Sequence, residues 1–325
     1  MPTILIPQFV HEPGPAIARE AGDVIYWNED RPPPRAELIA AITTADGMIC
    51  QSNCRVDAEL LDHARVLRVI ANVAAGYDNI DLAAATERGI AVCNTPVSAL
   101  HESTADLAFS LLLSVARRVG EAERYIRAGK WTFWSPQLLV GSDVHGRTLG
   151  IVGLGRIGQA VARRGRGFGM SIVYSGRTRR PEAEKELGAR YMPMDELLQT
   201  SDFVSIHVPS NAETRHLIGA RQLELMKPGA FLINAARGAI VDQAALYSAL
   251  VAGQIAGAGL DVFDPEPVSG SEPLLGLDNV VAVPHIGGAS LPTRERMAEM
   301  AARNVIAVLT GAAPPSCVNP TVLTK

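Results

Sequence analysis

The chain of 325 residues has no long apolar run. No stretch reaches the roughly 18 consecutive apolar residues that a membrane-spanning helix needs. Residues 1–7 lack a basic region followed by an apolar core, so no secretory signal is expected. The sequence therefore predicts a cytoplasmic protein without a membrane partner.

Cysteine is scarce and shows no pattern of pairs. The four cysteines are Cys50, Cys54, Cys93 and Cys317. Three residues separate Cys50 from Cys54, but no second Cys or His pair follows at zinc spacing. We therefore predict buried or idle thiols and no metal site.

An excess of positive charge is also absent. The 30 Lys and Arg residues against 34 Asp and Glu give a net charge of −4, which argues against a nucleic-acid partner. The basic cluster at 163–180 is too local to change this. No internal repeat, low-complexity tract or charged tail is present. A length of 325 residues and 47% hydrophobic content indicate a globular protein of two domains.

Short apolar segments alternate with helical patterns along the whole chain. This alternation is typical of parallel sheets joined by βαβ crossovers, so the predicted fold class is α/β with two doubly wound parallel sheets. The first series of strands is expected at residues 3–6, 24–27, 47–50, 69–73 and 90–93. The second series is expected at residues 148–152, 171–174, 203–208, 230–234, 257–262 and 280–283.

Two long helical patterns, at residues 101–118 and 293–309, mark the domain organisation. The first leads into the second series of strands. The second is amphipathic and long enough to run back and complete the first domain. We therefore expect residues 100–288 to form a domain inserted in another domain, which consists of residues 1–99 and 289–325.

The most informative segment is Gly153-Leu-Gly-Arg-Ile-Gly, which follows a predicted strand and leads into a predicted helix at 159–166. Gly153 permits a tight turn, Gly155 lets a pyrophosphate approach the backbone, and Gly158 permits close packing of helix on strand. The phosphates would bind at the helix N-terminus, where N–H groups and the helix dipole favour anions. The complete strand–turn–helix–strand setting predicts a dinucleotide site.

The acid that marks an NAD site is missing. An Asp or Glu about 20 residues beyond the turn should bind the ribose 2′-hydroxyl of NAD. No acid occurs between Gly155 and Pro181, and Arg177, Arg179 and Arg180 occupy the place. Arginines after a strand also suit a solvated loop. Together with the missing acid, they predict NADP(H) as the preferred coenzyme and NAD(H) as the weaker alternative.

Four later strands end on polar or turn-forming residues, at 207–210, 234–238, 261–267 and 284–288. Ligands bind outside the carboxyl ends of strands in an open parallel sheet, so these ends should line one cleft with the nucleotide. Taken alone, each residue has an ordinary structural explanation. Arg237 could cap carbonyl groups at a turn, Glu266 could be a solvated loop acid, and His285 could be a histidine with satisfied hydrogen bonds at a strand end. Three such groups on consecutive strand ends favour a catalytic set.

Several motifs in order now make the chain similar to the D-isomer-specific 2-hydroxyacid dehydrogenases over essentially its whole length. The matching segments lie at residues 71–81, 153–158, 233–238, 260–267 and 284–290. Tyr174-Ser-Gly-Arg and Lys130-Trp-Thr-Phe-Trp resemble the NADPH-preferring glyoxylate/hydroxypyruvate reductase and 2-ketogluconate reductase branch.

The resemblance implies a Rossmann coenzyme domain inserted in a flavodoxin-like substrate domain, and a homodimer. It also implies reduction of a small 2-keto acid (glyoxylate, hydroxypyruvate or 2-ketogluconate) to the D-2-hydroxy acid. Arg237 would clamp the substrate carboxylate in fork geometry. His285 would donate the proton, and Glu266 beside it would stabilise the protonated imidazole.

The resemblance also assigns binding residues. The substrate is expected to meet backbone N–H groups around Ala74, Ala75 and Gly76, together with Arg237 and His285. Asp261 is assigned to the nicotinamide carboxamide, and Thr104, in the first turn of its helix, either caps that helix or contacts the coenzyme. The expected coenzyme-binding residues are Thr104, Leu154, Gly155, Arg156, Ile157, Ser175, Gly176, Arg177, Thr178, Val208, Pro209, Thr214, Ala235, Ala236, Arg237, Asp261, His285 and Gly287.

Departures from the family pattern leave some questions open. Ala75 replaces a frequent Val and Gly288 a frequent Ser or Ala, which makes the cleft roomier and leaves the substrate's size open. Oxidation of phosphite or formate on the same scaffold is one alternative. A non-enzymatic, nucleotide-sensing scaffold like the transcriptional corepressors is the other, and the complete Arg–Glu–His set argues against it.

Overall fold

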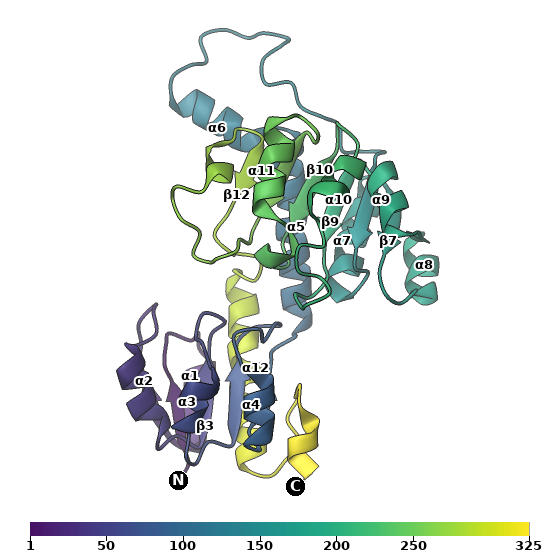
Figure 1. Cartoon of the computed structure of the whole chain (residues 1–325). Coiled ribbons are helices and arrows are strands. Elements are labelled where there is room, and N and C mark those ends of the chain that lie inside the picture. The colour runs from purple at the N-terminus through teal and green to yellow at the C-terminus, as the bar shows by residue number, and fades with distance from the viewer. Residues whose placement is uncertain (325) are drawn as a thin grey trace. The chain divides into compact units, whose positions relative to one another are not determined.

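The computed structural model describes residues 1–324 (Figure 1). The chain divides into two compact units. Unit 1 consists of Met1–Leu100 and the C-terminal part from Ala289 onward, and unit 2 consists of His101–Gly288. The ligand that each unit binds stays a prediction, and each unit is described by itself.

Unit 1 is built on a five-stranded parallel sheet with the order β2-β1-β3-β4-β5. Its strands are β1 (Thr3–Ile6), β2 (Asp23–Tyr26), β3 (Gly47–Cys50), β4 (Val69–Asn72) and β5 (Ala91–Cys93). One face packs against α1 (Gly14–Ala21) and α12 (Leu291–Leu309). The other packs against α2 (Arg35–Ile42), α3 (Ala58–Asp62) and α4 (Leu82–Glu87). A 3-10 turn, η3 (Pro320–Thr324), ends the unit.

Unit 2 contains a seven-stranded parallel sheet with the order β12-β11-β10-β9-β6-β7-β8. The order reverses direction at β6, as in a Rossmann fold. Its strands are β6 (Thr148–Val152), β7 (Ser171–Ser175), β8 (Arg190–Tyr191), β9 (Phe203–Ile206), β10 (Phe231–Asn234), β11 (Gly257–Leu260) and β12 (Val280–Ala282).

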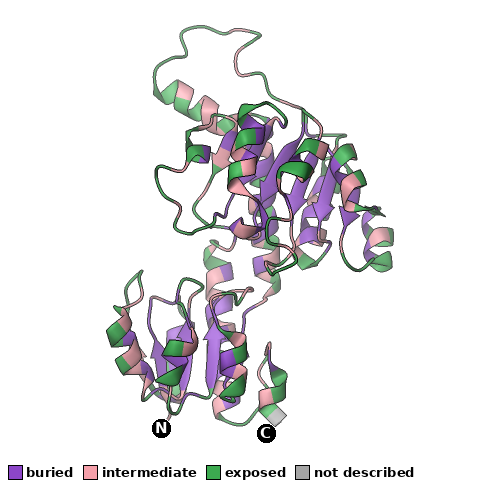
Figure 2. Cartoon of the chain, viewed as in Figure 1, coloured by how far each residue is buried: buried purple, intermediate pink, exposed green. Residues whose placement is uncertain are grey.

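Helices cover both faces of this sheet as well. On one face lie α5 (Ser98–Ala116), α7 (Arg156–Gly167) and α8 (Pro181–Leu187). On the other lie α9 (Met194–Thr200), α10 (Ala220–Leu225) and α11 (Gln243–Val251). The 3-10 turns η1 (Gly238–Ile240) and η2 (Pro273–Gly276) follow β10 and β11. Burial of the central strands on both faces explains their continuous apolar sequences (Figure 2).

The predicted fold class, α/β with two doubly wound parallel sheets, is confirmed. The predicted strands and helices include neither β8, which has only two residues, nor α6 (Val119–Arg127), which has no buried residue. Some boundaries also differ. Helix α5 begins at Ser98 and α7 at Arg156, and β9 and β11 each end two residues early because the following residues turn away from the sheet.

Ion pairs account for most of the basic cluster on α7. Arg164 contacts Glu102 at 2.9 Å and Asp106 at 2.6 Å, and Arg163 contacts Glu102 at 2.5 Å. These pairs join α7 to α5 on the outside of unit 2, so this cluster is engaged within the protein.

Cys50, Cys54 and Cys93 are buried, as predicted, and Cys317 is half-buried. Burial raises the pKa of the Cys54 thiol to about 11, which keeps it protonated. In the part of the chain that the structure describes, no group of three or more His, Cys, Asp or Glu could hold a metal ion. None of the helices within residues 1–324 is long and apolar enough to cross a membrane.

Candidate active site

The glycine turn of unit 2 connects β6 to α7. Gly153 has a φ of 97°, and a Cβ there would lie 2.8 Å from the carbonyl oxygen of His207. A Cβ at Gly158 would lie 2.2 Å from the Gly153 carbonyl oxygen, so helix and turn pack without room for a side chain. Gly155 instead faces open space: a Cβ would meet no heavy atom within 4 Å. No side chain caps α7, so its first N–H groups suit phosphate oxygens.

Beyond β7, the chain carries the residues expected near the adenosine ribose. The Ser175 carbonyl accepts a 2.8 Å hydrogen bond from Gly153 N–H, which joins this strand end to the glycine turn. Gly176 has open space where a Cβ would be, and Thr178 is exposed. Arg177 is 80% exposed and makes one weak ion pair, 3.4 Å from Glu213. Its guanidinium is therefore held loosely.

The neighbouring Arg179 is engaged within the protein. It contacts both carboxylate oxygens of Glu184, at 2.8 and 3.0 Å. Glu184 also accepts a 2.6 Å hydrogen bond from the buried Tyr174 hydroxyl, which in turn accepts one from Arg180 N–H at 2.8 Å. These groups fix the loop after β7. Among the arginines that occupy the place of the missing acid, Arg179 thus has a structural role.

The loop after β9 carries three further predicted coenzyme residues. Val208 is half-buried beside Gly153, while Pro209 and Thr214 close the loop, since the Thr214 hydroxyl donates to the Pro209 carbonyl at 2.7 Å. The adjacent His207 binds Ser205 Oγ through Nε2 at 2.8 Å. Burial lowers the pKa of His207 to about 4, so this histidine is neutral near pH 7.

Arg237 lies in the turn after β10, and a buried asparagine shapes that turn. The side chain of Asn234 accepts from Ala236 N–H at 3.1 Å and donates to the Arg237 carbonyl at 2.9 Å. Ala235, in the same turn, is buried. The Arg237 guanidinium donates to the Ala236 carbonyl at 2.8 Å. Asn234 therefore determines how the chain presents Arg237 at the strand end.

Asp261, at the end of β11, organises the turn after β12. Its two carboxylate oxygens accept from Ile286 N–H at 2.6 Å and Gly287 N–H at 2.9 Å. Burial raises the pKa of this carboxyl group, against the effect of these hydrogen bonds and of the His285 charge. A contact between Asp261 and the nicotinamide carboxamide stays a prediction.

Thr104 packs against the same turn. The distance from a Cβ at Gly287 to the Thr104 methyl would be 3.3 Å, and the Ser103 hydroxyl donates to the Gly287 carbonyl at 2.8 Å. Because α5 begins at Ser98, Thr104 lies in its second turn. The suggestion that Thr104 caps the helix is therefore wrong, and a coenzyme contact stays a prediction.

His285 and Glu266 form a hydrogen-bonded pair. The distance between His285 Nδ1 and Glu266 Oε2 is 2.7 Å, and Glu266 Oε1 accepts from Phe263 N–H at 2.9 Å. His285 has a φ of 52°, which is uncommon outside glycine and recurs at active sites. Its N–H donates to the Asp261 carbonyl at 2.8 Å, so both backbone and ring are fixed.

Electrostatics keep the Glu266 carboxylate ionised. Burial by itself raises the pKa of Glu266, but the hydrogen bonds from His285 and Phe263, with the charges of His285 and Arg237, lower it below its ordinary value. The three predicted catalytic residues thus follow β10, β11 and β12, which are neighbours in the sheet, and Arg237 is close enough to act on the charge of Glu266.

The predicted substrate loop, Ala74, Ala75 and Gly76, follows β4 in unit 1. Its carbonyl groups accept hydrogen bonds from Thr95 N–H at 2.8 Å, Asn94 Nδ2 at 2.7 Å and Asn72 Nδ2 at 2.9 Å, respectively. The loop therefore has a defined conformation within its own unit.

Several residues at these sites were not found from the sequence. They are Asn234 below Arg237, Glu213 beside Arg177, Ser103 at the Gly287 turn, and the asparagines that hold the substrate loop. Asn234 stands inside a motif, so its place at the end of a strand was a usable signal. The other contacts join distant segments, and the sequence gives no signal for them.

A parallel sheet with a glycine turn at its centre and a histidine–glutamate pair at neighbouring strand ends is typical of the class of dinucleotide-dependent dehydrogenases. Comparison with known proteins agrees: the family model of the D-isomer specific 2-hydroxyacid dehydrogenase, NAD binding domain, matches residues 109–287. The chain is also 50% identical to a glyoxylate reductase of Korarchaeum cryptofilum, over 99% of this chain and 97% of the relative.

Solved structures give the same result. A protein of Thermus thermophilus has 47% identity and a TM-score of 0.91, covering 97% of this chain and 99% of its own. An NADPH-dependent glyoxylate/hydroxypyruvate reductase of Sinorhizobium meliloti, in complex with NADP and malonate, has 35% identity and a TM-score of 0.85, covering 98% and 97%. The chain belongs to the D-isomer specific 2-hydroxyacid dehydrogenase family, and its coenzyme is a nicotinamide dinucleotide.

Proposed function

We propose that the protein reduces a small 2-keto acid to the D-2-hydroxy acid with NADPH, with glyoxylate as the first substrate to test and hydroxypyruvate and 2-ketogluconate next. The pair between His285 Nδ1 and Glu266 Oε2, 2.7 Å apart and beside Arg237, carries this proposal. The glyoxylate reductase relative at 50% identity supports the choice of substrate.

The glycine turn fits a dinucleotide. Gly155 and Gly176 face open space where side chains would otherwise lie, and the N-terminus of α7 has no side-chain cap. Leu154, Gly155, Arg156 and Ile157 would hold the pyrophosphate there. When bound, the coenzyme supplies the hydride.

The protein's own residues supply the proton and the charge. The hydrogen bond with Glu266 engages His285 Nδ1, so the other ring nitrogen, Nε2, is left for the substrate. Nε2 donates a proton to the keto oxygen during reduction and accepts one during oxidation. The Arg237 guanidinium binds the substrate carboxylate through two parallel hydrogen bonds, which a lysine cannot make. In unit 1, the Ala74–Gly76 loop offers backbone N–H groups of the kind that bind a carboxylate.

NADPH preference rests on Arg177. Its guanidinium is exposed and loosely held, so it can turn to a 2′-phosphate at little cost, with Ser175 and Thr178 beside it. NAD(H) is the weaker alternative, because no acid stands between Gly155 and Pro181 to accept the ribose 2′-hydroxyl.

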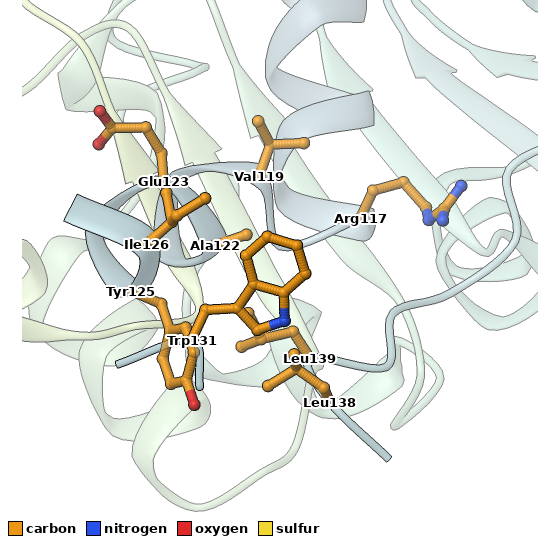
Figure 3. A pocket seen from close by; sticks show the side chains of 9 residues that line it. All are labelled: Arg117, Val119, Ala122, Glu123, Tyr125, Ile126, Trp131, Leu138 and Leu139. Atoms are coloured by element: carbon orange, nitrogen blue, oxygen red, sulfur yellow. The ribbon is translucent and has the colours of Figure 1, made fainter. Parts of the chain in front are cut away.

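We also propose a homodimer that forms through α6 and the loop after it. This segment projects from unit 2 (Figure 1) and exposes Phe133 (73%) and Trp134 (75%). It encloses an apolar hollow of about 440 Å³, with Trp131 and Ile126 among its lining residues (Figure 3). Exposed apolar surface of this kind is typical of subunit interfaces. Sedimentation should show a dimer, and Trp134→Glu should weaken it. A monomeric parent protein would contradict this part of the proposal.

A spectrophotometric panel at 340 nm tests the function. Glyoxylate, hydroxypyruvate, pyruvate and 2-ketogluconate are each measured with NADPH and with NADH, and phosphite and formate are measured with NADP⁺ and NAD⁺. We expect turnover of glyoxylate with NADPH. Failure on all four keto acids, with tight NADPH binding, would favour the non-enzymatic scaffold. Turnover of phosphite or formate alone would favour that alternative chemistry.

A further inference from the structure

The substrate loop of unit 1 is held by its carbonyl groups. Thr95, Asn94 and Asn72 donate to the carbonyls of Ala74, Ala75 and Gly76 over 2.7–2.9 Å. In a trans peptide unit, the N–H points opposite to the carbonyl group of the same unit. Fixing these three carbonyls therefore turns the following N–H groups, of Ala75, Gly76 and Tyr77, away from the anchoring side chains.

These three N–H groups have no hydrogen-bond partner among residues 1–324. Consecutive N–H groups of this kind form a concavity that binds anions. A carboxylate needs several donors, so the loop suits the carboxylate of a keto acid. The orientation of the donors depends on the residues that hold the carbonyls.

Asn94, which holds the Ala75 carbonyl, is itself held by a residue far away in the sequence. Its Nδ2 donates to the Ala75 carbonyl at 2.7 Å, while its Oδ1 accepts from the Ser316 hydroxyl at 2.5 Å. An asparagine amide has a donor end and an acceptor end, and the Ala75 carbonyl, which only accepts, requires the donor end. The Ser316 hydroxyl donates to the acceptor end and so holds the amide in this position. The reversed amide would place an oxygen against the Ala75 carbonyl oxygen.

Ser316 is itself held in place. Its N–H donates to Asn304 Oδ1 at 3.0 Å, and Asn304 Nδ2 donates to the Asn94 carbonyl at 3.1 Å. Asn304 lies on α12 and is fully buried. Asn304 of α12 thus fixes the backbone of Asn94, and Ser316, in the C-terminal segment that follows α12, fixes its side chain. Ser316 and Asn94 lie 222 residues apart in the sequence.

We propose that Asn94, held in place by Ser316, is a positioning residue for the substrate carboxylate. It keeps the Ala75 carbonyl turned inward and the Gly76 N–H turned toward the substrate. The inference rests on the proposed function, since it takes the loop N–H groups as carboxylate ligands. It adds a requirement for the C-terminal segment in substrate binding.

Steady-state kinetics and binding test the inference on the full-length protein. Ser316→Ala should raise KM for glyoxylate about 3- to 10-fold, with kcat nearly unchanged, because a hydrogen-bond contribution to carboxylate binding is lost equally from ground and transition states. Asn94→Asp should raise KM on the order of 100-fold, since it places a carboxylate oxygen against the Ala75 carbonyl. Ser316→Thr retains the hydroxyl and should restore the parent value.

Asn319→Ala is the matched control. Asn319 lies in the same C-terminal segment and is bonded to Val92 N–H, the Ile90 carbonyl and the Thr86 hydroxyl, and to no part of the substrate loop. It should lower the melting temperature more than Ser316→Ala while leaving KM within about twofold. A KM as high as that of Ser316→Ala would mean that Ser316 merely holds the segment, and would overturn the inference.

Calorimetric binding of oxalate, measured in the presence of NADPH, separates this inference from the proposed function. Oxalate is a dicarboxylate probe whose binding requires no turnover. Ser316→Ala should bind it about 3- to 10-fold more weakly than the parent. Equal affinities, or no binding by the parent, would overturn the inference. Absence of glyoxylate reduction by the parent, with this difference in affinity intact, would overturn the proposed function alone.

Discussion

The two ends of the sheet in unit 2 hold their charged side chains in opposite ways. After β11 and β12, both carboxylate oxygens of Asp261 and Glu266 accept hydrogen bonds, and the His285 ring is fixed at 2.7 Å from Glu266. After β7, Arg177 is 80% exposed and has one weak contact. The first end is preorganised, as a chemical step requires. The second leaves Arg177 able to reorient, as the proposed selection between coenzymes requires.

Replacing the proton donor should break the preorganised end most severely. His285→Gln keeps a polar side chain but cannot donate the proton, so kcat for glyoxylate reduction should fall about 10²- to 10⁴-fold. The NADPH dissociation constant, measured by fluorescence titration, should stay the same because the glycine turn is untouched. Retention of a tenth or more of the parent activity would place the proton donor elsewhere.

Arg237→Lys tests the carboxylate clamp. The charge remains but the fork is lost, so kcat/KM for the keto acid should fall about 10- to 150-fold, the value of one charge-assisted hydrogen bond. Arg221→Lys is the control, since Arg221 forms only an exposed ion pair with Asp195. This substitution should leave kcat/KM unchanged. Nearly full activity of the Arg237→Lys protein would show that the clamp lies elsewhere.

Arg177→Ala addresses the exposed end. Loss of a charge-assisted hydrogen bond to the 2′-phosphate should weaken NADPH binding about 10- to 150-fold and leave NADH nearly unchanged. Arg179→Ala should not discriminate between the coenzymes, because Arg179 serves Glu184. If Arg177→Ala weakened both coenzymes equally, Arg177 would have a structural role.

Glu266→Gln changes the pH dependence at the preorganised end. The lowered pKa of Glu266 keeps it ionised throughout the range where a histidine titrates, so its charge stabilises protonated His285 there. The alkaline limb of the reduction profile should therefore move to lower pH, and the acidic limb of the oxidation profile should move with it. Profiles superimposable on the parent's would exclude Glu266 as the histidine's partner.

The smallest effect is expected at Glu213. Its carboxylate competes with a 2′-phosphate for Arg177, and an exposed ion pair contributes little, so Glu213→Gln should tighten NADPH binding about 2- to 5-fold. NADH binding should not improve. Glu224→Gln, an exposed acid on α10, is the control. An unchanged NADPH affinity would remove Glu213 from coenzyme selection.

The fold was predictable because its signals are local. Apolar runs of four or five residues between turn-forming residues mark buried parallel strands, and the strand before Gly153 and the helix after it set the glycine turn in context. Helix starts were less certain: α7 begins with Arg156-Ile-Gly, which contains no side-chain cap to mark it. Helix α6 carries apolar residues at helical spacing, Val119, Ala122 and Ile126, and this signal was overlooked.

At the candidate site, the placement of three residues at neighbouring strand ends was predictable, and the contacts that support them were not. Arg237, Glu266 and His285 each stand beside a strand end or a proline, which the sequence displays. That Arg179 is occupied by Glu184 depends on how the loop folds back, and the bond from Ser316 to Asn94 spans 222 residues. Such contacts follow from tertiary packing and leave no periodic signal.

The hydrogen bond from the Ser103 hydroxyl to the Gly287 carbonyl brings together the two places where the chain passes between the units. Residues 101–288 therefore begin and end side by side. A domain whose two ends are adjacent can be inserted into another chain without a spacer. For the same reason, a short connection can replace it in the chain from which it is removed. In this architecture, such a transfer would move the glycine turn, Arg237 and His285 together as one set.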